Sequence, residues 1–125
     1  MSKSIYDDMK KSEKQVADYL EQLGLWWKYQ APVFVYDEKK RPRVWTPDFF
    51  LPKLGMYVEV VGSEKAYYDE SQNYQYRQEI FEANNCIVIF VHYWKKDWRS
   101  HLIRMIHQFE SQRHAEVQKM LESVL

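Results

Sequence analysis

Apolar residues recur at helical spacing near both ends of the chain. Over residues 4–23 they are three, four or seven positions apart, which predicts a helix with one apolar face that ends at Gly24. These residues are Ile5, Met9, Val16, Tyr19, Leu20 and Leu23. A stripe over residues 96–125 predicts a long amphipathic C-terminal helix. It comprises Trp98, Leu102, Ile106, Phe109, Val117, Met120, Leu121 and Val124.

The middle of the chain carries short runs of β-branched and aromatic residues, which are typical of strands. Val33–Tyr36 predicts a first strand, and the charged residues 37–43 predict a hairpin-like loop after it. Residues 44–51 predict a second strand and Met56–Val61 a third. The short turn at residues 53–55 favours antiparallel pairing of the second and third strands.

A second helix and a fourth strand follow these three strands. Helical spacing over residues 67–84 predicts the helix, and the six apolar residues 86–91 predict a central strand that is buried on both faces. The order helix, three strands, helix, strand, helix predicts an α/β fold, with a mixed sheet of about four strands flanked by helices. A chain of 125 residues is the usual size of one domain.

Composition narrows the class of protein. Lysine plus arginine and aspartate plus glutamate number 18 each, so any attraction to a polyanion must come from a local surface. The single cysteine, Cys86, lies in an apolar run and predicts a buried thiol without an internal disulfide partner. The sequence has no apolar run of about 20 residues and no apolar stretch near its N-terminus. We therefore expect a cytoplasmic protein that makes no membrane contact.

Two acidic residues stand out in the predicted strands. Asp48 follows a proline, and Glu59 lies within an apolar strand, where an unneutralised carboxylate would cost several kcal/mol of desolvation. Together with the backbone carbonyl of Val60, these carboxylates form an oxygen ligand set that suits Mg²⁺. Alternatively, Asp48 could satisfy a turn while Glu59 pairs with a buried arginine such as Arg77.

The sequence around these acids resembles the PD-(D/E)xK phosphodiesterase superfamily, which has the restriction-endonuclease-like fold. The resemblance rests on Thr-Pro-Asp-Phe-Phe-Leu-Pro at residues 46–52 and Gly-Met-Tyr-Val-Glu-Val-Val-Gly at residues 55–62, and it covers about residues 12–91. Within the superfamily the chain is most like the small very-short-patch repair endonucleases and the N-terminal nucleases of Tn7-type transposases. The C-terminal helix lies outside the resemblance.

The resemblance implies a nuclease that hydrolyses DNA phosphodiester bonds with Mg²⁺, or with Mn²⁺ in its place. It implies that Asp48 and Glu59 act as catalytic metal ligands, and it maps an additional acid of the first helix to Glu13. An ordinary surface charge is the alternative role for Glu13.

The chain departs from the family pattern at Val61, which stands where the family has a lysine. A valine can neither orient an attacking water nor stabilise developing charge. Arg77 is our preferred replacement, ahead of a group of nearby lysines and glutamines. That group comprises Lys14, Lys65, Gln72, Gln75 and Gln78. Two alternatives remain: a salt bridge from Arg77 that fills an abandoned metal site, and a nuclease fold kept as a DNA-binding or assembly module.

Two further surfaces suggest partners. Lys39, Lys40, Arg41 and Arg43 form a basic loop beside the aspartate strand, which could bind DNA phosphates or simply be a solvated turn. The long C-terminal helix could form a homodimer surface or a lid over the sheet.

Overall fold

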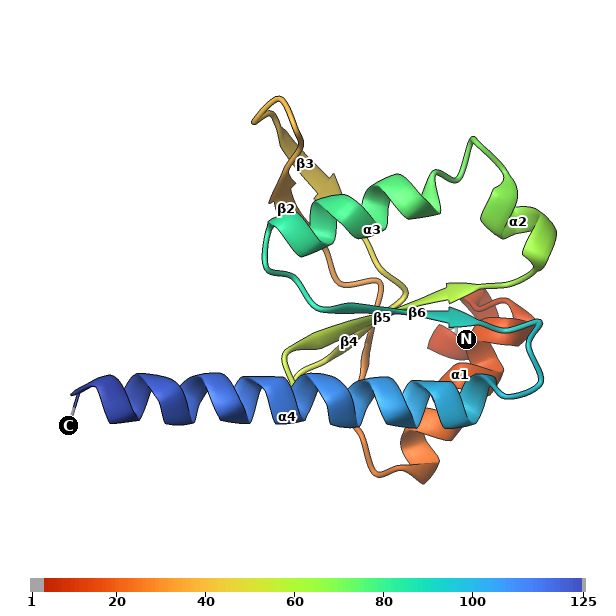
Figure 1. Ribbon diagram of the computed structural model, residues 1–125. Helices are drawn as coiled ribbons and strands as arrows, with labels where there is room; N and C mark the ends of the chain where they lie inside the picture. The colour runs from red at the N-terminus through yellow and green to blue at the C-terminus, as the bar shows by residue number, and fades with distance from the viewer. Residues whose placement is uncertain (1–3, 125) are drawn as a thin grey trace.

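A computed structural model of the protein describes residues 4–124 (Figure 1). It is a mixed α/β fold in which a four-stranded sheet, a separate two-stranded sheet and a long C-terminal helix are combined. The helices are the 3-10 helix η1 (Ile5–Asp8), α1 (Lys11–Gln22), α2 (Glu64–Tyr68), α3 (Tyr74–Ala83) and α4 (Trp98–Val124). The strands are β1 (Lys28–Tyr29), β2 (Val33–Tyr36), β3 (Pro42–Trp45), β4 (Phe49–Leu51), β5 (Met56–Val61) and β6 (Val88–His92).

The main sheet has the strand order β1-β4-β5-β6. Strands β4 and β5 are antiparallel, as the sequence predicts, and they are joined by a tight turn in which Gly55 has a φ of +62°. Strand β6 runs parallel to β5 after the chain crosses over through α2 and α3. Strands β2 and β3 pair only with each other, from Val33 opposite Trp45 to Tyr36 opposite Pro42.

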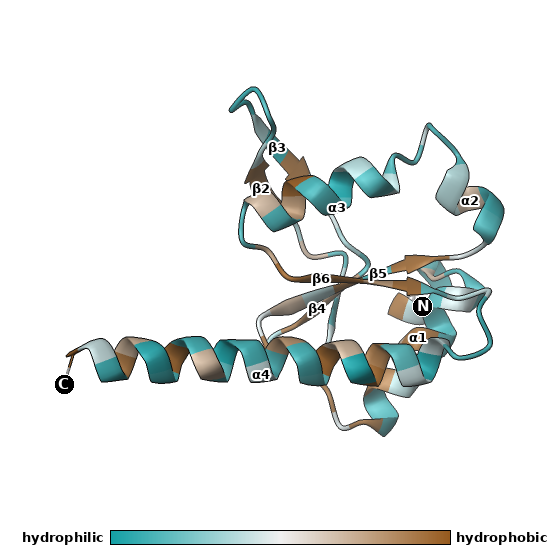
Figure 2. Ribbon diagram, in the orientation of Figure 1, coloured by the Kyte–Doolittle hydropathy of each residue, from teal (hydrophilic) through white to brown (hydrophobic). Residues whose placement is uncertain are grey.

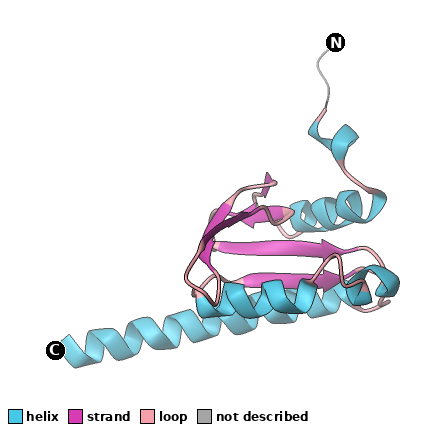
Figure 3. Cartoon of the chain, turned by 90° about the horizontal axis from the view of Figure 1, so that it is seen from above, coloured by secondary structure: helices cyan, strands magenta, loops and turns pink. Residues whose placement is uncertain are grey.

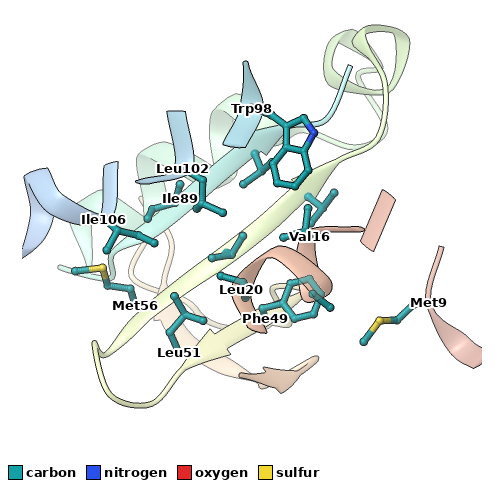
Figure 4. Packing of buried hydrophobic residues seen from close by; sticks show 14 residues of the cluster. Met9, Val16, Leu20, Phe49, Leu51, Met56, Ile89, Trp98, Leu102 and Ile106 are labelled. Carbon is teal, nitrogen blue, oxygen red and sulfur yellow. The ribbon is translucent and has the colours of Figure 1, made fainter. Parts of the chain in front are cut away.

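Two apolar clusters hold these layers together. On one face of the sheet, α1 and α4 pack through Val16, Leu20, Leu102 and Ile106 against strand residues such as Phe49 (Figure 4). On the other face, α3 and the β2-β3 hairpin pack on β5 and β6 in a second cluster. Helices therefore cover both faces of the β5-β6 pair, which Figures 1 and 3 show from two sides.

The stripe of α4 is buried only along its first half. Trp98, Leu102 and Ile106 are buried, whereas Val117 and Met120 are more than half exposed where the helix extends beyond the sheet (Figure 2). The predicted homodimer surface on this helix stays a prediction. In the part of the chain that the structure describes, no helix has the length and apolarity needed to cross a membrane.

Two predictions for the N-terminal half were wrong in their boundaries. The first helix is interrupted, because Ser4 caps the short helix η1, Met9 is extended and α1 begins only at Lys11. The predicted strand over residues 44–51 is two strands in different sheets. Pro47 lies between them, and a proline has no N–H with which to continue a ladder. Gly24 does adopt the predicted left-handed conformation, with a φ of +73°.

Three further predictions need correction. The helix over residues 67–84 is split into α2 and α3, because Asp69 accepts a hydrogen bond from the Ser71 N–H and turns the chain. Strand β6 lies at an edge of the sheet and not at its centre; its apolar run reflects the helices on its two faces. Cys86 precedes β6 and is only half-buried, and this partial burial raises the pKa of its thiol.

The packing of α4 predicts a contrast between two identical substitutions. Leu102→Ala should lower the free energy of unfolding by about 2–5 kcal/mol, because Leu102 is fully buried and its truncation leaves a cavity. Leu121→Ala should change it by less than about 0.5 kcal/mol, since Leu121 is 53% exposed. Urea unfolding measures both; equal losses would show that the distal half of α4 is packed in solution.

Candidate functional site

The β4-β5 register places Asp48 opposite Glu59. Phe49 pairs with Val58 and Phe50 with Tyr57. One further step along this antiparallel register, just before β4 begins, brings Asp48 to the position across from Glu59. Side chains that stand directly opposite share a face of the sheet, with Cβ atoms about 4.5–5.5 Å apart. The two predicted acids therefore lie together, on the face that α3 covers.

Val60 turns its backbone polar groups toward the β4 side of β5. The Tyr57 N–H donates to the Ile87 carbonyl at 2.8 Å, and the Val61 carbonyl accepts from the Tyr93 N–H at 3.0 Å. Odd-numbered residues of β5 are therefore bonded toward β6, and even-numbered residues face the opposite way. This alternation directs the carbonyl of Val60 toward the segment that carries Asp48.

Pro47 leaves that carbonyl without a cross-strand donor. Pro47 would pair with Val60 if β4 began two residues earlier, but it has no N–H to donate. The N–H of Val60 donates instead to the Asp48 Oδ2 at 2.7 Å. A Pro-Asp pair at this position thus fixes one carboxylate oxygen and frees a carbonyl oxygen next to Glu59.

The carboxyl group of Asp48 binds a proton unusually tightly. Burial raises its pKa, and so do the hydrogen bond that the protonated carboxyl donates to Glu59 and the negative charge of Glu59, which together bring the pKa to about 8. The Val60 N–H and the side chain of Glu13 act in the opposite direction. The raised pKa favours the protonated form of Asp48 beside Glu59.

Glu13 is a buried part of this cluster. Only 7% of Glu13 is exposed, so the alternative of an ordinary surface charge is wrong. Its Oε1 accepts from the Tyr29 hydroxyl at 2.8 Å and from the Lys10 N–H at 2.9 Å, while burial and the nearby Asp48 raise its pKa. Sequence reasoning missed Tyr29, since nothing separates it from the other aromatic residues of its segment.

Arg77 reaches the site from the first turns of α3. Its Nη2 donates to the Glu59 Oε2 in an ion pair whose side chains are 21% and 7% exposed, and its guanidinium carbon lies 5.2 Å from the ring centre of Tyr74. Its Nε is buried and has no hydrogen-bond partner among the described residues. The other two candidate cations, Lys14 and Lys65, are exposed. The predicted salt bridge between Arg77 and Glu59 is therefore present.

Val61 takes no part in the acidic cluster. Its side chain is fully buried in the cluster that includes Ile80, Phe81 and Phe90. The cation that reaches Glu59 is Arg77 of α3 and not a residue of β5.

The basic loop is built around a buried acid that sequence reasoning did not single out. Asp37 accepts hydrogen bonds from the backbone N–H groups of Lys39 and Arg41 and from the side chains of Arg41 and Arg43. Burial works to raise its pKa, but these bonds lower the pKa to about 2. Lys39 and Lys40 are exposed at the tip, where Lys40 has a φ of +62°.

The oxygen atoms of the site can be compared with the ligands that a divalent cation requires. Within residues 4–124, no group of three or more His, Cys, Asp or Glu side chains is arranged to hold a metal ion. Asp48 and Glu59, with the carbonyl of Val60, supply three oxygen atoms, which fits Mg²⁺ because this ion usually keeps several waters.

Comparison of the chain with protein-family profiles, curated proteins and solved structures gives no match.

The raised pKa of Asp48 predicts a pH-dependent stability. Between its ordinary value of about 4 and its folded value of about 8, the native state holds a proton that the unfolded chain releases. The stability that this proton contributes is therefore fully present below about pH 4 and is lost as the pH rises to about 8. Asp48→Asn should remove this pH-dependent loss, because an amide does not ionise, and so raise the free energy of unfolding by about 2 kcal/mol relative to the wild type at pH 8 in EDTA.

Urea unfolding from pH 5 to pH 8 measures this difference. Glu13, His92 and His101 also titrate, so the useful quantity is the variant minus the wild type at each pH. Asp18→Asn on the exposed face of α1 is the matched control and should leave the pH profile unchanged. A difference for Asp48→Asn that does not grow with pH would contradict the assignment.

Proposed function

We propose that this protein is a metal-dependent nuclease of the restriction-endonuclease-like class that hydrolyses DNA phosphodiester bonds. One observation carries the proposal: Asp48 stands opposite Glu59 while Pro47 leaves the carbonyl of Val60 without a cross-strand donor. This arrangement destabilises the folded chain unless something neutralises the acids. Such a cost is expected where a cation is to be bound.

Asp48, Glu59 and the Val60 carbonyl would hold Mg²⁺, or Mn²⁺ in its place. When bound, the ion would polarise a phosphate oxygen and make water more acidic. In its absence Asp48 keeps a proton, and Glu59 pairs with Arg77. The metal therefore substitutes for a proton and for part of an ion pair, so that metal affinity should rise with pH.

Arg77 would stabilise the charge that develops on the phosphate. An arginine stays protonated at any working pH, so it serves as a hydrogen-bond donor and not as a general base. Its buried Nε has no partner in the described protein, which leaves a donor that a phosphate oxygen could satisfy. Glu13 would act as an auxiliary acid by holding Asp48 through their shared contact.

The surface next to Arg77 suits a nucleic-acid backbone. A cavity of about 420 Å³ lies between β3 and the start of α3, and Thr46, Ser71, Asn73 and Arg77 are among its lining residues. Backbone N–H groups and hydroxyl side chains are common phosphate ligands.

The β2-β3 hairpin adds a second basic surface. Lys39 and Lys40 lie exposed at its tip, and the side chains of Arg41 and Arg43 are 54% and 44% exposed despite their bonds to Asp37. The hairpin projects from the body of the protein on the side of α3 (Figure 1). We propose that it contacts DNA phosphates on either side of the cleaved bond.

A cleavage assay tests the function. Plasmid, linear duplex, branched and single-stranded DNA are incubated with the protein in Mg²⁺ or Mn²⁺. Asp48→Asn and Glu59→Gln should each lower the cleavage rate at least about 100-fold, because each removes a charged ligand. Glu110→Gln on the exposed face of α4 is the matched control and should cleave like the wild type. Cleavage that persists in both site variants would refute the assignment.

A second function is favoured by the ion pair itself. Arg77 already neutralises Glu59, and Val61 is buried where the family has its lysine. Both features suit a nuclease fold that has lost its activity and serves as a DNA-binding module. In that case the cluster is purely structural and the hairpin provides the function.

Thermal unfolding of Arg77→Met separates the two functions. Without metal, the substitution should cost about 2–3 kcal/mol because Glu59 is left buried and unpaired, and adding Glu59→Gln should restore part of this loss. For a nuclease, Mg²⁺ should raise the midpoint of Arg77→Met more than that of the wild type, since the ion replaces the lost cation. For a binding module, Mg²⁺ changes neither midpoint, while Lys39→Gln with Lys40→Gln weakens DNA binding.

A further inference from the structure

Strand β6 ends the main sheet, and one row of its backbone groups points away from β5. The carbonyl of Ile87 and the N–H of Tyr93 both bond to β5. Backbone groups alternate in direction along a strand, so the odd-numbered residues of this segment face β5. The even-numbered residues Val88, Phe90 and His92 therefore direct their N–H and C=O groups away from β5. The His92 carbonyl accepts the Lys95 N–H at 3.0 Å, so the edge offers the backbone groups of Val88 and Phe90 and the N–H of His92.

This edge lies at the bottom of a groove. Helix α3 runs along one face of β6 and α4 along the other, as Figures 1 and 3 show from two directions. The groove has a volume of about 740 Å³. Gln78 and Glu82 of α3 line one wall, and Gln108 and Gln112 of α4 line the other. The amide side chains of Gln78, Gln108 and Gln112 both donate and accept hydrogen bonds, as peptide groups require, and the carboxylate of Glu82 accepts them.

The sequence of β6 does nothing to discourage pairing at this edge. Natural edge strands are commonly protected by a lysine, a proline, a bulge or a covering loop. Strand β6 reads Val-Ile-Phe-Val-His and pairs with β5 in unbroken register. It is therefore a regular, apolar template that is five residues long, or about 17 Å.

We propose that this groove binds an extended peptide segment of a partner protein, which adds to β6 as a fifth strand of the sheet. Main-chain hydrogen bonds to Val88, to Phe90 and to the N–H of His92 would supply the affinity, and contacts with the two helical walls would supply selectivity. The volume and the length of the edge both suit a segment of about five residues.

The two helical walls of the groove favour a single extended segment, and not a second copy of this chain, as the molecule that binds there. A second copy would have to bring its own β6 within about 4.8 Å of this one. Its β6 is flanked by the same two helices, and the helices of the two copies would meet before the strands could pair. A lone extended segment has no such flanking helices.

Charge at the two ends of the groove defines the chemistry of the partner. Glu82 and Glu116 lie at the end where the chain enters β6, since the Asn85 N–H donates to the Glu82 carbonyl in the turn before the strand. Arg113 lines the same end, but it donates to the carbonyls of Leu54 and Gly55, so the two carboxylates leave this end acidic. Lys95 supplies the positive charge at the opposite end, where the chain leaves β6, and it lies beside His101, whose pKa is lowered by burial. The segment should therefore carry a basic residue at one end and an acidic residue at the other.

Fluorescence anisotropy with two synthetic peptides tests the proposal. Each peptide has an alternating Val-Thr centre, with Lys and Glu at its two ends in one order or the other, because main-chain pairing tolerates many side chains. One order should bind at least about fivefold more tightly than the other. The same peptide methylated at alternate backbone nitrogens should bind at least about tenfold more weakly, since it cannot donate to the edge.

Matched variants locate the peptide on the protein. Gln112→Trp should fill the groove and abolish binding, whereas Glu110→Trp, on the same helix but outside the groove lining, should not. Hydrogen exchange at the Phe90 amide should slow when the peptide binds.

Three results would overturn the proposal. The first is the absence of binding by either peptide at about 1 mM, which is the weakest affinity that a short added strand should show. The second is binding that survives both methylation and Gln112→Trp. The third is a Phe90 amide that is already protected in a self-associated form of the free protein, which would assign the edge to a second copy.

Discussion

Two carboxyl groups stand opposite each other where β4 meets β5, and most of the surrounding structure compensates for their repulsion. Asp48 keeps a proton well above its ordinary pKa, its Oδ2 accepts the N–H of Val60, and Glu59 is paired with Arg77. Each compensation comes from a different element. The pair can exist only because the sheet, the crossover helix α3 and the first helix are assembled around it.

The placement of these compensating groups follows from the path of the chain. Pro47 ends the pairing of the hairpin segment and lets the chain pass from the small sheet into the main one, so that Asp48 enters β4 in the correct register. The crossover from β5 to β6 then lays α3 on the same face, which delivers Arg77. A metal-binding site and an ion pair are two ways to neutralise the same acids. For this reason a nuclease and an inactive binding module share one architecture.

The crossover has a second consequence at the far side of the sheet. Because β6 is the last strand and helices cover both of its faces, its free edge forms the floor of a groove between α3 and α4. The acidic cluster and this groove are separated by β5, which contributes Glu59 to one and hydrogen-bonds to the strand that forms the other. One sheet can therefore serve two binding surfaces without sharing side chains between them.

The sequence by itself determined the pieces that depend on local pattern. It gave the correct β2 and β5, the left-handed Gly24, the amphipathic α4 and the antiparallel β4-β5 pair with its two acids. Tertiary structure alone decided which strand lies at the edge, where α3 begins and that Glu13 is buried against Tyr29. The physical reason is that hydrophobic periodicity records which faces of an element are covered, but not by what. Neighbours such as Arg77 and Glu59, 18 positions apart, are set by packing.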